Sequence, residues 1–179
     1  MHDMMLPADC GAASIVRLAG PADEEGVVEM IRLMHDDGEW GNFDLDGRPF
    51  PFNDTKARAI VQRATQGGRN APDAGRAWLG VIGDVGQLKG SAYVALQEPS
   101  MSDGFFLAEL WSWICPAFRD SAASDALLAF SIGIADKRGM RLVMAAMTQQ
   151  RLGKSRFYAR RFGPPIGSVY DYTPTGVGA

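Results

Sequence analysis

The cysteines and histidines of this sequence do not have the spacings of a covalent or metal-dependent catalytic site. Cys10 and Cys115 lie far apart and fit no metal-ligand spacing. Cys115 follows an apolar run, which indicates a small buried side chain. His35 stands beside Asp36 and Asp37, and we interpret it as a structural or exposed residue. Because no Cys–His or Ser–His pairing is evident, we expect any group transfer to proceed without a covalent enzyme intermediate.

The composition fits one domain of ordinary size and argues against two broad classes of protein. The 179 residues are 46% hydrophobic and 22% charged, as in an average globular protein. The formal net charge of −3 argues against a general nucleic-acid binder. No window approaches the roughly 18 apolar residues of a membrane span, and the N-terminal stretch is not that of a signal peptide. We therefore expect a soluble, cytoplasmic protein.

The first half of the chain predicts a short strand and two amphipathic helices. Residues 1–14 are interpreted as a lead-in, and residues 15–18 as the strand. Helical spacing predicts the buried face of the first helix: Val27, Met30, Ile31 and Met34. A second helix, capped by Asn53 or Asp54, has a predicted face of Ala57, Ile60, Val61 and Ala64. A long loop from Asp36 to Phe52 separates them and carries several aromatic residues.

Three strands are predicted next, over residues 77–82, 90–96 and 105–115. Because the links between them are short, we expect antiparallel neighbours. The sequence Gly83-Asp84-Val85-Gly86 lies in the first link. It has no third glycine and no following helix, so it does not indicate a dinucleotide-binding loop.

The second half predicts a long helix between two strands. Its apolar face comprises Ala123, Leu127, Phe130 and Ile134, and Gly139 ends it. Residues 142–147 are a continuous apolar run, which predicts a strand covered on both faces and parallel to the strand before the helix. A short basic helix over residues 155–162 and a final strand over residues 166–172 complete the pattern.

This order of elements resembles the GNAT superfamily of acyl-CoA N-acyltransferases over nearly the whole chain. Residues 114–119 (ICPAFR) resemble the family's turn into the cofactor loop. Phe157 and Tyr158 ahead of Gly163 resemble its aromatic helix, and residues 165–170 (PIGSVY) resemble its closing strand. The resemblance implies one α/β (α+β) domain over residues 15–179. Its central sheet would be mixed and mostly antiparallel, flanked by helices, with one splayed parallel strand pair.

The resemblance also implies a site for acetyl-CoA or another acyl-CoA. Backbone groups of Trp113, Ile114 and Cys115 would pair with the pantetheine arm. The pyrophosphate would lie at a helix N-terminus, where unpaired amides and the helix dipole attract an anion. The residues implied there are Arg119, Asp120, Ser121, Ala122, Ala123 and Ser124. The chain departs from the family pattern at this point, because Ala122 replaces a glycine and Asp120 adds a negative charge. The alternative interpretation of Ser121 is a simple helix N-cap.

Two residues are implied as catalytic by the resemblance. Glu109 is the candidate base that accepts a proton from the attacking amine, and Tyr158 is the candidate acid for the departing thiolate. Strand alternation places Glu109 on the same face as Trp111 and Trp113, unless a bulge intervenes. The alternative interpretations are a surface carboxylate for Glu109 and a packing role for Tyr158. An asparagine common in the family is absent, and Arg151 stands near its place.

Charged residues on both sides of the implied site have two interpretations, contact with a ligand or simple exposure to solvent. The basic cluster of Arg151, Lys154, Arg156, Arg160 and Arg161 fits a contact with the cofactor's ribose phosphate or a solvated helix face. In the long loop, Glu39, Asp44 and Asp46 fit attraction of a cationic amine or simple solvation.

The sequence therefore supports two hypotheses of different classes. The first is an acyl-CoA-dependent N-acetyltransferase that transfers an acetyl group to a small-molecule or peptide amine by direct attack in a ternary complex. The second is a cofactor-free protein with the GNAT fold and a structural or interaction role in a homo-oligomer or a larger assembly. The departures at Asp120 and Ala122 favour the second.

Overall fold

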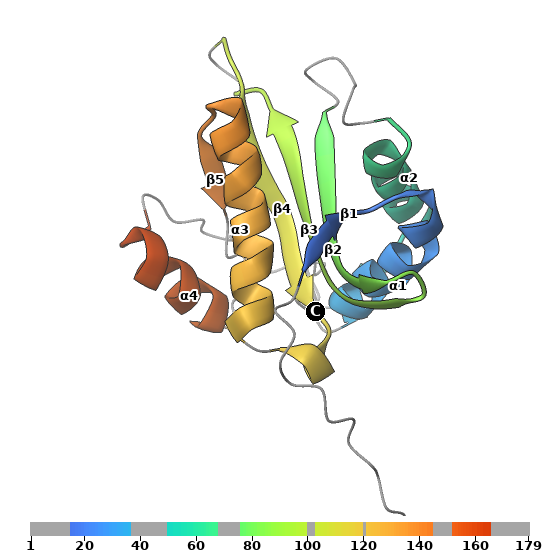
Figure 1. Cartoon of the computed structure of the whole chain (residues 1–179). Helices are drawn as coiled ribbons and strands as arrows, with labels where there is room; N and C mark the ends of the chain where they lie inside the picture. The colour runs from blue at the N-terminus through green and yellow to red at the C-terminus, as the bar shows by residue number, and fades with distance from the viewer. Residues whose placement is uncertain are drawn as a thin grey trace, which may run out of the picture.

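One mixed sheet forms the centre of the molecule (Figure 1). The computed structural model describes residues 15–36, 50–67, 76–99, 103–119, 121–144 and 152–165. Within them the strands follow the spatial order β1 (Val16–Leu18), β2 (Ala77–Asp84), β3 (Gln87–Gln97), β4 (Phe106–Ile114) and β5 (Leu142–Met144). The pairs from β1 to β4 are antiparallel, and β4 pairs with β5 in parallel. The predicted mixed α/β architecture is confirmed.

Helices cover both faces of this sheet (Figure 1). Helices α1 (Glu24–Asp36) and α2 (Asp54–Thr65) lie on one face, and α1 follows a short 3-10 turn, η1 (Pro21–Asp23). The long helix α3 (Ser121–Arg138) crosses the other face after a second 3-10 turn, η4 (Pro116–Phe118). Helix α4 (Leu152–Phe162) lies beside α3, on the same side of the sheet.

The face under α1 and α2 is buried largely as the sequence predicts. All four residues of the predicted α1 face are buried, and so are Ala57, Val61 and Ala64 of α2. The side chain of Asn53 caps α2 by accepting a hydrogen bond from the amide of Lys56 at 2.9 Å. Ile60 was predicted to be buried and is 37% exposed. The i, i+4, i+7 stripe of small residues already fills the contact, which leaves Ile60 at its margin.

The face under α3 depends on a close approach between the helix and β2. Ala123 and Leu127 are buried, and Phe130 and Ile134 pack against the core. A Cβ atom placed on Gly80 would lie 2.7 Å from the ring of Phe130, so a larger residue there would require the ring or the helix to move. Gly139 follows the helix with a φ of 61°, a left-handed conformation that glycine adopts without strain.

Two predictions about the second half of the chain differ from the structure or lie beyond it. The strand predicted over residues 142–147 as covered on both faces is half-buried over Leu142–Met144, and residues 145–147 lie outside the described residues. Helix α4 begins three residues before the predicted start. Residues 1–14, most of the aromatic loop (37–49), Asp120, Arg151 and the predicted final strand (166–172) lie outside the described residues.

Candidate functional site between β4, α3 and α4

A β-bulge decides which way Glu109 faces. Tyr93 of β3 pairs with Trp111, whereas the next residue, Val94, pairs with Glu109, so Leu110 is the extra residue of β4. The bulge reverses the alternation of side chains along the strand. Glu109 therefore points to the α3 face, while Trp111 and Trp113 pack in the core under α1 and α2. The expectation that all three share one face was conditional on an unbroken strand, and the bulge overturns it.

Glu109 is a buried carboxylate surrounded by donors. Its side chain is only 1% exposed. Tyr158 Oη on α4 donates a hydrogen bond to Oε1, and Ser131 Oγ on α3 donates to Oε2 at 3.2 Å. Lys154 Nζ on α4 lies 3.4 Å from Oε1. These donors and the lysine charge supply the partners that a buried carboxylate requires. The two candidate catalytic residues are thus in direct contact, although 49 residues separate them in the sequence.

The surroundings of Tyr158 keep its hydroxyl protonated. Burial and the neighbouring Glu109 carboxylate, through its charge and hydrogen bond, raise the pKa of Tyr158 well above its usual value. Its ring lies 5.7 Å from that of Phe157 and 6.4 Å from that of Phe162. Both aromatic neighbours belong to α4 itself, and the contact of Tyr158 with β4 is the hydrogen bond from its hydroxyl to Glu109.

The edge of β4 that faces β5 pairs with it from Leu107 to Glu109, and residues 145–150, which follow β5, lie outside the described part of the chain. On this edge, the carbonyl oxygen of Ser112 lies 3.5 Å from Lys154 Nζ. That of Ile114 accepts a hydrogen bond from Arg119 Nε at 3.0 Å. Among the backbone groups implied for pantetheine, those of Ile114 face this edge.

Trp113 and Cys115 direct their backbone groups to β3 instead. Cys115 donates its amide to Lys89 at 2.8 Å, and the carbonyl of Trp113 lies beside Gly90. Burial raises the pKa of the Cys115 thiol, so this residue is not an activated nucleophile. The Trp113 side chain is buried in the core, and within the described residues its indole N–H has no hydrogen-bond partner.

The residues implied for a pyrophosphate site lie before and within the first turn of α3. The helix begins at Ser121, and Asp120 before it lies outside the described residues. Ala122 is exposed, and its Cβ is not packed against the sheet, whereas Ala123 is buried in the core. Arg119 is turned back toward Trp113, with its guanidinium carbon 5.7 Å from the ring centroid. The first turn of α3 contains no acidic residue.

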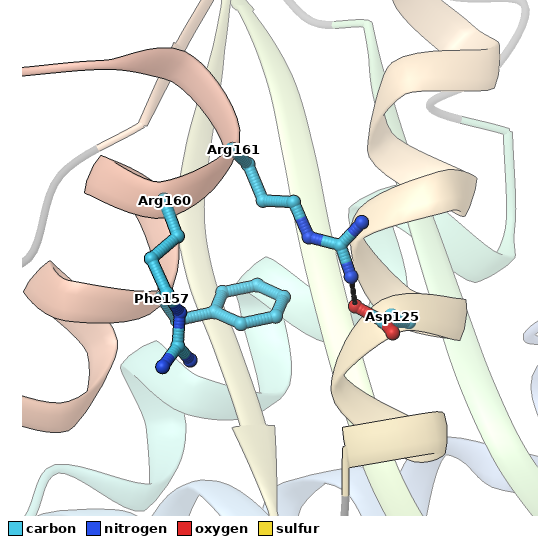
Figure 2. Close-up of a pocket in the computed structure, with 4 residues that line it drawn as sticks. All are labelled: Asp125, Phe157, Arg160 and Arg161. Atoms are coloured by element: carbon cyan, nitrogen blue, oxygen red, sulfur yellow. Dashed lines mark hydrogen bonds and ion pairs between the residues drawn. The ribbon is translucent and has the colours of Figure 1, made fainter.

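A pocket of about 410 Å³ lies between α3 and α4. It is lined by Asp125, Phe157, Arg160 and Arg161. Figure 2 shows Arg161 reaching from α4 to form an ion pair with Asp125 on α3, beside the ring of Phe157. The basic cluster of α4 is therefore divided: two arginines line the pocket, Lys154 turns toward Glu109, and Arg156 is exposed.

Comparisons with solved structures identify the architecture. The chain superimposes on a protein from Clostridium acetobutylicum described as a predicted acetyltransferase with acetyl-CoA (TM-score 0.64, 12% identity, 88% of this chain and 94% of that one). It also matches a ribosomal-protein-alanine N-acetyltransferase from Brucella melitensis biovar Abortus 2308 (TM-score 0.63, 14% identity, 90% and 99%). A third match is an acetyltransferase described as putative, from Arthrobacter sp. FB24 (TM-score 0.61, 19% identity, 92% and 97%).

The chain has the GNAT fold. No protein-family model matches it, and no curated protein matches its sequence. The resemblance seen in the element order is thus confirmed at the level of the fold, at identities too low to carry an activity from one protein to another.

Several residues of this GNAT-fold site were missed or left ambiguous at the level of sequence. Ser131 is a polar residue within an apolar helix face and is fully buried, which could have marked it as a partner for a buried charge. Lys154 was identified only as one of five basic residues. Nothing near Asp125 in the sequence indicated a role for it, because its ion-pair partner Arg161 lies 36 residues away.

Other features of the GNAT-fold chain lie away from this site. His35 donates from Nε2 to the carbonyl of Phe50 at 2.7 Å and lies edge-on to Phe52, in agreement with a structural role. The described residues contain no cluster of His, Cys, Asp or Glu side chains placed to hold a metal ion. None of the described helices has the length and apolar character needed to cross a membrane.

Proposed function

We propose that this chain is an acyl-CoA-dependent N-acetyltransferase acting on a small-molecule or peptide amine by direct attack in a ternary complex. The observation that carries the proposal is the contact between Tyr158 on α4 and the buried carboxylate of Glu109 on β4. A proton donor and a carboxylate are the two groups that amide formation from a thioester requires.

Two arginines beside α3 support a role for the pocket in binding coenzyme A. The space of about 410 Å³ is lined by Asp125, Phe157, Arg160 and Arg161, and Arg161 is ion-paired with Asp125. Arginine is suited to phosphate recognition, and the start of a helix favours an anion. Acetyl-CoA would supply the activated acetyl group as a thioester.

The roles of the chain's own residues follow from their partners. Glu109 would accept a proton from the amine, directly or through a water molecule. Tyr158 would donate a proton to the departing thiolate, and its contact with Glu109 fixes the orientation of its hydroxyl. Ser131 holds the second carboxylate oxygen and therefore acts as a positioning residue.

One observation favours the cofactor-free alternative. Lys154 and Arg119 lie on the carbonyls of Ser112 and Ile114, which are edge groups that a pantetheine arm would approach. If these side chains remain in place, they fill the edge and leave the fold with a structural or interaction role. The two hypotheses therefore differ in whether coenzyme A takes over these two carbonyls, while Lys154 keeps its contact with Glu109.

Isothermal titration of the full chain with acetyl-CoA and with CoA separates the hypotheses. The proposal expects saturable binding, and release of CoA thiol when a panel of amines is added. Absence of heat at millimolar ligand, together with an unchanged melting temperature, would overturn the transferase and favour the structural role. Size-exclusion chromatography of the same sample would then report any assembly.

A further inference from the structure

The amine of Lys154 lies at the centre of the proposed catalytic site. Its Nζ is 3.4 Å from Glu109 Oε1 and 3.5 Å from the carbonyl oxygen of Ser112, and it lies 5.5 Å from the centroid of the Tyr158 ring. The side chain is 29% exposed, so it is enclosed by the site and still reachable. The sequence has three other lysines, Lys56, Lys89 and Lys137, and no contact with Glu109 is recorded for any of them.

We propose that Lys154 is a self-acetylation site, so that one amine acceptor of this protein is its own side chain. The inference rests on the proposed function, because it requires an acetyl thioester at the β4 edge. The geometry supports it in a specific way: the base that would activate a foreign amine already holds this amine. Proximity of this kind raises the effective concentration of a nucleophile by many orders of magnitude.

The transfer balances with the groups present and an acetyl thioester. The Lys154 ammonium gives one proton to Glu109 and becomes a neutral amine, which forms a C–N bond with the acetyl carbon. The C–S bond to CoA breaks, and the thiolate takes a proton from Tyr158. The nitrogen releases its second proton as the amide forms, which restores Tyr158, and the proton on Glu109 passes to solvent.

A counter-ion role for Lys154 predicts a different chemical behaviour. The Lys154 side chain is half-buried and ion-paired with Glu109, so it should react slowly with a non-specific acetylating reagent. Self-acetylation predicts that the same lysine reacts fast with acetyl-CoA. Slow labelling of Lys154 by the non-specific reagent together with fast labelling by acetyl-CoA therefore indicates a directed transfer and not random modification.

The test compares two acetyl donors on the full chain by intact mass and peptide mapping. With a trace of acetic anhydride and no acetyl-CoA, Lys154 should label more slowly than the exposed Lys56 and Lys137. With acetyl-CoA the order should reverse, with Lys154 acetylated at least about tenfold faster than either. The fraction modified per unit time should not depend on protein concentration, because the reaction is intramolecular.

Two variants locate the reaction and its base. Lys154→Arg should remove the added acetyl group while keeping the positive charge beside Glu109. Glu109→Gln should slow acetylation of Lys154 by about tenfold or more and should speed its labelling by acetic anhydride. If circular dichroism shows that Glu109→Gln does not fold, the test uses the unaltered chain. There, a rate of Lys154 acetylation that is independent of protein concentration supports self-acetylation.

Failure of this inference is distinguishable from failure of the proposed function. If CoA binds by calorimetry and foreign amines are acetylated, but Lys154 is modified no faster than Lys137, self-acetylation is wrong and the transferase stands. A rate proportional to protein concentration would also overturn it. If CoA does not bind at all, both the proposed transferase function and self-acetylation are wrong.

Discussion

Tyr158 Oη on α4 donates a hydrogen bond to Oε1 of Glu109 on β4. The carboxylate has no access to bulk water, so the phenol is one of the few groups that satisfy it. The contact also ties α4 to the centre of the sheet. A change at either residue is therefore expected to affect both chemistry and stability, and experiments must separate the two.

Tyr158→Phe is expected to lower kcat at least about 100-fold while leaving the fold intact. The variant removes one hydroxyl and keeps the ring that packs beside Phe157. The measurement is release of CoA thiol with a panel of amines, alongside circular dichroism. Tyr93→Phe is the matched control, because Tyr93 is a buried tyrosine on the opposite face of the sheet. A Tyr158→Phe enzyme with unaltered kcat would leave Tyr158 as a packing residue only.

The fold was predictable because its signals are local and periodic. The face of α1, the cap at Asn53 and the stop at Gly139 follow from residues within a few positions of each other. The antiparallel pairing of β2, β3 and β4 followed from the short links between them. These features need no knowledge of distant contacts.

The arrangement of the site was less predictable because it depends on a bulge and on long-range contacts. Nothing in the sequence around Leu110 marks it as the extra residue of β4, yet it decides which face receives Glu109. The partners of Glu109 on α3 and α4 lie 22 and 49 residues away. Residue types suggested the candidates, and only the tertiary fold determines which of them meet.

Arg160→Ala is expected to weaken CoA binding about tenfold, the equivalent of roughly 1.4 kcal/mol for one charge-assisted contact with a phosphate. Arg160 lines the pocket between α3 and α4. Arg156→Ala is the matched control, since Arg156 is an exposed arginine of the same helix that does not line this pocket. Calorimetry at two salt concentrations gives both dissociation constants. Equal losses in the two variants would point to a general charge effect and not to a site.

The stability of the protein is expected to fall as the pH rises above 10, in part because of Tyr158. The pKa of Tyr158 is raised in the folded state above its ordinary value of 10.0. Above pH 10 the unfolded chain releases the phenolic proton and the folded chain keeps it, so alkali favours unfolding.

Urea unfolding between pH 8 and pH 11.5 measures this effect. Relative to Tyr158→Phe, the unaltered chain should lose up to about 1.4 kcal/mol of its unfolding free energy per pH unit above pH 10. The two curves should run parallel below that pH. Parallel curves at all pH values would mean that Tyr158 ionises as easily in the folded chain as in the unfolded one.

Two glycines near α3 provide a matched test of how the helix packs on the sheet. In Gly80→Ala, the added methyl group would lie 2.7 Å from the ring of Phe130, so the ring or the helix must move. We expect a loss of about 1–3 kcal/mol in unfolding free energy. Gly133 lies within α3, where an added Cβ meets no atom within 4 Å. Gly133→Ala should therefore stabilise the protein by about 0.5–1 kcal/mol, because alanine loses less conformational entropy in a helix.

The double variant Gly80→Ala, Phe130→Leu tests whether the clash between these two residues causes the loss of unfolding free energy. A smaller side chain at position 130 makes room for the methyl group, so the double variant should be more stable than the sum of the two single effects predicts. Urea denaturation at one temperature gives all the required free energies. If the two single effects simply add, residues 80 and 130 do not touch in solution, and α3 crosses β2 elsewhere. Because Ser131 follows Phe130 directly and holds Glu109, that result would also displace the carboxylate from the place assigned to it here.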